Sequence, residues 1–126
     1  MTNPEYIREL PGGLRLAHRH MPDTDSVTLQ IFFGAGGRYE DMQREYGVSH
    51  FLEHLLFQGS KKYPSAKILS ETVDGVGGFM NAYTTAELTS YMQKFHQISL
   101  LRSPIFWLTS RCDHCLIQLK LIESVA

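Results

Sequence analysis

Residues 47–59 read Gly-Val-Ser-His-Phe-Leu-Glu-His-Leu-Leu-Phe-Gln-Gly, and this stretch predicts an amphipathic helix. At about 100° per residue, its apolar side chains share one face and its polar side chains lie roughly opposite. The apolar side chains are Val48, Phe51, Leu52, Leu55 and Leu56. The polar side chains are His50, Glu53 and His54. Gly59 suits the left-handed conformation that ends many helices. We therefore expect one face of the helix to pack and the other to carry chemistry.

The polar face has the composition of a metal site. His50 and His54 are four residues apart, so their imidazoles lie one turn apart on one side of the helix, where two ring nitrogens can converge on a zinc ion. Glu53 lies between them in angle and can take a proton from a water that attacks a peptide carbonyl. A histidine pair alone more often decorates a polar surface. The intervening carboxylate and the opposed apolar stripe favour the metal site here.

Alternating apolar residues predict strands on both sides of this helix. The predicted strands are residues 14–18, 26–33, 79–84 and 88–95, the last two joined as a hairpin. Ser65 is the predicted N-cap of a second helix with an apolar stripe. That stripe consists of Ile68, Leu69, Thr72, Val73 and Val76. The polar run 38–46 is expected to be a solvated loop. Two strands, two helices and two strands in this order predict an α+β fold, a mainly antiparallel sheet with helices packed on one face.

The composition excludes several classes of protein. The chain has 126 residues, of which 43% are hydrophobic and 20% charged, which suits one globular domain. Its net charge of −1 offers no basic surface for a nucleic acid. The sequence has no apolar run of membrane-spanning length and no leader-like start. With two cysteines, a disulfide scaffold is not expected. We expect a cytoplasmic protein without nucleic-acid or membrane partners.

Three stretches together resemble the pitrilysin and insulinase family of zinc metallopeptidases. His50 to His54 has the His-x-x-Glu-His pattern of inverzincins. Residues 77–84, Gly-Gly-Phe-Met-Asn-Ala-Tyr-Thr, are similar to the family's Gly-x-x-x-Asn-Ala-Tyr-Thr strand, and residues 37–40, Gly-Arg-Tyr-Glu, are similar to its N-terminal segment. The likeness covers roughly residues 6–97. It implies the N-terminal domain of an enzyme whose two homologous halves close like a clam shell.

The resemblance also implies roles for individual residues. His50 and His54 would bind Zn²⁺, and Glu53 would be the general base. A peptide or protein substrate would pair with the edge of the strand 79–84, with Asn81 and Ala82 as contacts. A second homologous domain or subunit is the implied partner. For Asn81, the closing of a turn is an equally weighted alternative, and Tyr83 is expected in the core.

A third zinc ligand is the point at which the sequence departs from the family. A catalytic zinc site takes three protein ligands and keeps one open position, and the motif supplies two. The resemblance places the third, a glutamate on a later helix, just beyond Ala126, and Glu123 is the nearest carboxylate. Glu71 and Asp74 are expected to solvate a helix, and Glu87 to cap the hairpin or form an ion pair.

The tail, residues 101–126, reads unlike the family. We therefore expect a metallopeptidase domain over residues 1–100 and a tail that is truncated or frame-shifted. In the tail, Cys112, His114 and Cys115 form a lone Cys-x-x-Cys run, which is a weak zinc signal. Two functions remain open: an incomplete zinc endopeptidase domain, or a non-catalytic subunit of the same fold that binds peptides or a partner.

Overall fold

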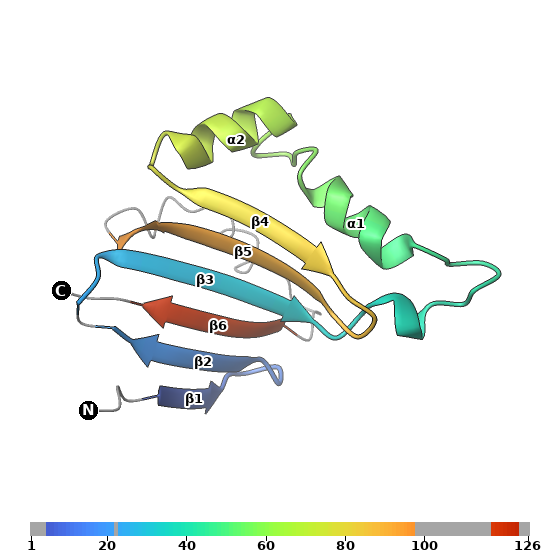
Figure 1. The fold of residues 1–126 in the computed structure, drawn as a ribbon, viewed down its shortest axis with the longest axis horizontal. Coiled ribbons are helices and arrows are strands. Elements are labelled where there is room, and N and C mark those ends of the chain that lie inside the picture. The colour runs from blue at the N-terminus through green and yellow to red at the C-terminus, as the bar shows by residue number, and fades with distance from the viewer. Residues whose placement is uncertain (1–4, 22, 98–116, 124–126) are drawn as a thin grey trace.

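The computed structural model describes residues 5–21, 23–97 and 117–123. It contains one six-stranded sheet with the strand order β1-β2-β6-β3-β5-β4 (Figure 1). The strands are β1 (Glu5–Glu9), β2 (Arg15–His20), β3 (Ser26–Phe33), β4 (Phe79–Thr84), β5 (Thr89–His96) and β6 (Ile117–Glu123). The pairing of β2 with β6 is parallel, and the other four pairings are antiparallel. The predicted α+β class with a mainly antiparallel sheet is confirmed.

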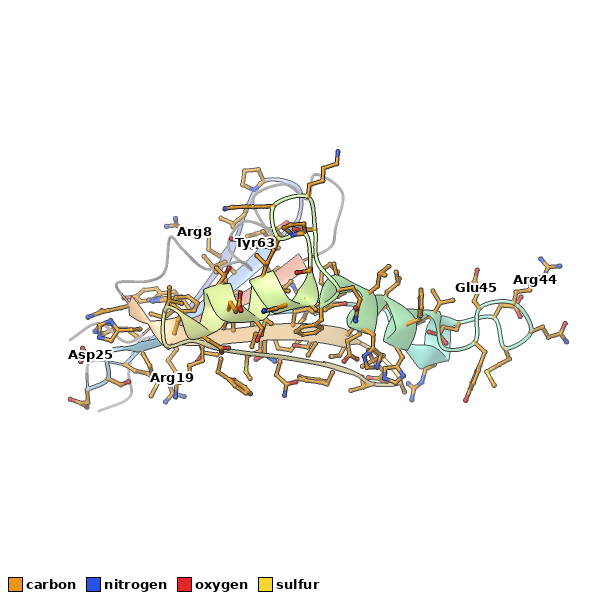
Figure 2. All side chains as sticks on the ribbon, turned by 90° about the horizontal axis from the view of Figure 1, so that it is seen from above. Arg8, Arg19, Asp25, Arg44, Glu45 and Tyr63 are labelled. Atoms are coloured by element: carbon orange, nitrogen blue, oxygen red, sulfur yellow. The ribbon has the colours of Figure 1, made fainter. Side chains whose placement is uncertain are left out.

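The helices gather at the β4 end of the sheet, far from the edge formed by β1 (Figure 1). They are the 3₁₀ helix η1 (Gly37–Tyr39), α1 (Val48–Leu56) and α2 (Ala66–Asp74). The helix α1 contacts β4 and β5, and α2 contacts β4. Seen from above, the loop that carries Arg44 and Glu45 projects away from the sheet (Figure 2). Within the described ranges, no helix has the length and apolar character needed to cross a membrane.

The core lies on one face of β3 and β5. Its buried residues are Val27, Leu29, Ile31, Tyr91 and Phe95. The antiparallel register sets Val27 opposite Phe95 and Ile31 opposite Tyr91, so these side chains stack across the two strands. Phe57, just after α1, packs against this cluster, with its ring centroid 6.5 Å from that of Tyr91. The alternation predicted for residues 26–33 is therefore confirmed.

The second helix begins where the sequence predicts. The Ser65 side chain accepts a hydrogen bond from the Ile68 amide at 3.3 Å, as an N-cap does. The predicted apolar stripe is only partly buried, because Leu69 and Val73 are covered whereas Ile68 is 42% exposed. At the end of the helix, the amide of Gly78 donates to the Val73 carbonyl at 2.9 Å and leads the chain into β4.

Two strands were not predicted. β1 escapes detection because its apolar residues are exposed, Ile7 by 79%, and no alternation marks a buried face. β6 comes from the tail and lies between β2 and β3. No local sequence pattern predicts these two pairings. Glu123, the carboxylate nearest to the expected third ligand, is the last residue of this strand and not part of a helix. Cys112, His114 and Cys115 lie outside the described residues.

Candidate metal and peptide site

The two histidines of the motif meet on one side of α1. The Nε2 atoms of His50 and His54 are 3.1 Å apart, and their ring centroids are 4.7 Å apart. With zinc–nitrogen bonds of about 2.0–2.1 Å, two nitrogens of a tetrahedral site lie about 3.3–3.4 Å apart. The observed separation therefore fits two ligands of one zinc ion. Within the described part of the chain, no third histidine, cysteine or carboxylate joins them to complete a metal-binding group.

Glu53 points toward the sheet. Its Oε2 accepts a hydrogen bond of 2.6 Å from the hydroxyl of Thr84, the last residue of β4. Tyr91 of β5, which is only 9% exposed, is close enough to interact electrostatically with this carboxylate. Burial raises the pKa of Tyr91 to about 12, and the negative charge of Glu53 adds to the rise. The carboxylate is therefore held between the helix and the sheet, with one oxygen fixed by a strand.

The orientation of α1 corrects the prediction from its apolar stripe. The five apolar side chains of the stripe are 39–64% exposed, and no residue of α1 is fully buried. Ser49 and Glu53 are half-buried instead. The helix is turned so that Glu53 meets Thr84 on the sheet, and this rotation directs the apolar stripe outward. The expectation that the apolar face packs while the reactive face lies opposite is wrong in the described structure.

The first turn of α1 is capped from outside the helix. Its N-cap, Gly47, has φ +82° and no side chain to offer. The carboxylate of Glu40 takes that place, because Oε2 accepts from the Gly47 amide and Oε1 from the Ser49 amide, both at 2.7 Å. The bonds from Ser49 and Gly47 hold the pKa of Glu40 below its usual range. No sequence pattern indicates this role for Glu40, since the residue lies seven positions upstream of Gly47 in a run expected to be a solvated loop.

The segment that carries Glu40 is fixed to the β4–β5 hairpin. The amide of Gly37 donates to the Thr85 carbonyl at 3.2 Å, and the amide of Arg38 donates to the Ala86 carbonyl at 2.7 Å. The side chains of Arg38 and Glu87 form an ion pair, which confirms one of the two roles expected for Glu87. The hairpin therefore supports η1, and through it the residue that caps α1.

The edge strand β4 carries the two predicted substrate contacts. Asn81 is exposed, and its Oδ1 accepts a hydrogen bond from the Ala82 amide at 2.9 Å. Because Asn81 lies within β4, the alternative that it closes a turn is wrong. Tyr83 is 45% exposed and accepts from Gln30 Nε2 at 3.3 Å, so its expected place in the core is also wrong. The contact roles of Asn81 and Ala82 remain predictions.

Comparisons with known proteins match most of this chain to one family. The family described as Insulinase (Peptidase family M16) matches residues 15–102. An uncharacterised zinc protease of Rickettsia felis is 42% identical over 85 residues, which cover 68% of this chain and 20% of the relative. The mitochondrial-processing peptidase subunit beta of Saccharomyces cerevisiae is 41% identical over 86 residues, which cover 68% of this chain and 18% of the relative.

A solved structure shares the fold as well. The crystal structure of a protease from Helicobacter pylori aligns with a TM-score of 0.70 at 26% identity, and the match covers 78% of this chain and 23% of that one. The chain thus spans about a fifth of the length of the curated relatives it matches.

Proposed function

Since the chain belongs to the insulinase family of peptidases, we propose that α1 is the metal-binding helix of a zinc-dependent endopeptidase. The observation that carries the proposal is the convergence of His50 and His54, whose Nε2 atoms are 3.1 Å apart, beside the carboxylate of Glu53. Relatives named as zinc proteases support the choice of metal. In this proposal the two histidines are ligands and Glu53 is the general base.

Each residue of the proposed site has its own role in peptide hydrolysis. Bound between His50 and His54, zinc would supply a Lewis acid that polarises water and the scissile carbonyl. Glu53 takes the proton of the attacking water and returns it to the leaving amine. Thr84 holds Oε2 of Glu53, which leaves Oε1 to exchange that proton. Tyr91 is buried close enough to Glu53 for the charge of the carboxylate to raise the pKa of the phenol.

We propose that the substrate binds along the outer edge of β4. An extended peptide can pair with the main chain of an edge strand, which gives affinity with little dependence on sequence. The Ala82 amide is turned to the Asn81 side chain, so a substrate carbonyl would replace Oδ1 of Asn81 as its acceptor. A second homologous domain or subunit, closing over this edge, is the partner we propose for the chain.

Zinc content and peptide cleavage, measured on the purified chain, test the proposal. Wild type and Glu53→Gln are expected to bind zinc near one equivalent, whereas His50→Ala and His54→Ala are not. Cleavage of an unstructured peptide mixture is expected to disappear in Glu53→Gln and to persist in Glu71→Gln, a matched change on the outer surface of α2. Cleavage that persists in Glu53→Gln would contradict the assignment of the base.

One observation favours a second candidate, a non-catalytic subunit that binds peptides or a partner. The described residues supply two metal ligands where a catalytic zinc site takes three. Two relatives are by name subunits, the mitochondrial-processing peptidase subunit beta of Saccharomyces cerevisiae and its probable counterpart in Arabidopsis thaliana, which supports the subunit part of this candidate. Peptide binding without cleavage, unchanged by Glu53→Gln, would establish this candidate in place of the first.

A further inference from the structure

The helix that carries the proposed metal ligands lacks a cap within its own sequence. Gly47 contributes no side chain, and the first turn of α1 holds no acidic residue. A helix N-terminus leaves amides that need acceptors and carries a partial positive charge. Among the described residues, Glu40 is the one whose side chain bonds these amides: its carboxylate accepts hydrogen bonds from the amides of Gly47 and Ser49, both at 2.7 Å. Order in the first turn therefore depends on a residue outside the helix.

The two metal ligands depend on that order unequally. His50 immediately follows Ser49 and lies in the first turn, whereas His54 lies one turn later. Next to His54, Glu53 is bonded to Thr84 and holds the second half of the helix on the sheet. Fraying of the first turn would thus carry His50 away from His54 and open the 3.1 Å approach of their Nε2 atoms.

The loop between Glu40 and α1 gives the helix a backbone bond, in which the Val48 amide donates to the Glu45 carbonyl at 3.0 Å. It carries Arg44 and Glu45 and projects away from the sheet (Figure 2). Glu40 instead directly follows η1, which the β4–β5 hairpin anchors through the amides of Gly37 and Arg38. The carboxylate therefore links the start of α1 to the sheet across the base of the loop.

We infer that Glu40 is a positioning residue of the metal site, which sets zinc affinity by holding the first turn of α1 so that His50 meets His54. This inference rests on the proposed zinc-binding function. Both carboxylate oxygens of Glu40 are bonded to helix amides, Oε2 to that of Gly47 and Oε1 to that of Ser49. Its effect on zinc binding passes through the helix.

The test compares Glu40→Ala and Glu40→Gln with Glu45→Ala in the full chain. Glu45 lies in the same loop, is exposed, and makes its helix contact through its backbone carbonyl, so its substitution is a matched loss of charge. By competition with a chelator, we expect zinc affinity to fall about tenfold in Glu40→Ala and about threefold in Glu40→Gln, which keeps one oxygen acceptor. Glu45→Ala should stay within about twofold of wild type.

A second readout needs neither metal nor activity. In the zinc-free chain, Glu40→Ala should speed hydrogen exchange of the Gly47 and Ser49 amides and weaken the nuclear Overhauser effect between the rings of His50 and His54. The core amide of Phe95 should exchange as in wild type, which separates local positioning from a general loss of stability.

Equal zinc affinity in Glu40→Ala and Glu45→Ala would overturn the inference, and so would unchanged exchange of the two amides. A wild-type chain that binds no zinc would overturn the proposed function instead. In that case the amide exchange and the ring contact decide alone whether Glu40 positions His50.

Discussion

Gly36 lets η1 pack closely against the β4–β5 hairpin, because it has no side chain. Its replacement by alanine gives the sharpest test of the fold around the site. Its backbone, with φ −163° and ψ 179°, is extended, so alanine adds no backbone strain. A Cβ there would lie 2.4 Å from the Thr85 carbonyl oxygen and 2.7 Å from the Leu88 nitrogen. Both are main-chain atoms of the hairpin and cannot rotate aside.

The cost follows from these distances. Ordinary contact begins near 3.4 Å, so η1 must retreat by about 1 Å (3.4 minus 2.4) to admit the methyl group. The bond from the Gly37 amide to Thr85, now 3.2 Å, would exceed hydrogen-bonding distance, and the 2.7 Å bond from the Arg38 amide to Ala86 would stretch. At about 0.5–1.5 kcal/mol for each bond, Gly36→Ala should lower the free energy of unfolding by about 1–3 kcal/mol.

Urea unfolding followed by circular dichroism measures this change. Gly34→Ala is the matched control, because a Cβ on Gly34 meets no atom within 4 Å. The midpoint should fall in Gly36→Ala and stay near wild type in Gly34→Ala, with similar dependence on urea in both. Equal midpoints for the two variants would refute the close approach of η1 to the hairpin.

Three further predictions concern the base and the core. In the peptidase assay, Thr84→Val should lower kcat about tenfold with little change in KM, because Glu53 loses a hydrogen bond to a charged oxygen, and Thr84→Ser should retain the rate; equal rates for the valine and serine variants would contradict this role. Phe95→Ala, at a position 2% exposed, should cost about 3–5 kcal/mol of unfolding free energy, whereas the exposed neighbour Lys94→Ala should change it little. The pKa of Tyr91 is raised from 10.0 to about 12, so the stability that its neutral form contributes is present below pH 10 and is lost as the pH rises toward 12. The free energy of unfolding should therefore fall with pH across this range, and Tyr91→Phe should reduce the slope of that fall. An unchanged slope in Tyr91→Phe would argue against the buried phenol.

The elements that sequence predicts best are those whose pattern and packing agree. The pattern of residues 26–33 predicts β3 with its observed bounds, because Val27, Leu29 and Ile31 alternate on a face that is buried. For α1 the helix was predicted, but the direction of its apolar stripe was not, because a stripe identifies an apolar face without identifying what covers it. The bond between Glu53 and Thr84, which turns the helix, joins residues 31 positions apart.

In the candidate site too, the sequence predicts what depends on local geometry and not what depends on tertiary contacts. The convergence of His50 and His54 follows from helical geometry, since the two positions are one turn apart. Glu40 could not be found in this way, because its bonds to Gly47 and Ser49 depend on how η1 seats on the hairpin. The available signal was the glycine at the N-cap position. Because glycine has no side chain, the first-turn amides of the helix need a hydrogen-bond acceptor from another residue.

The pairing of Asn81 with the Ala82 amide also bears on how copies of the chain behave toward one another. An outer strand with an unmet amide invites the edge of another copy, which is a route to aggregation. Here the neighbouring carboxamide already satisfies that amide at 2.9 Å. A chain that pairs at this position therefore has to replace the carboxamide with a carbonyl of its own, and this applies to another copy of the chain as well.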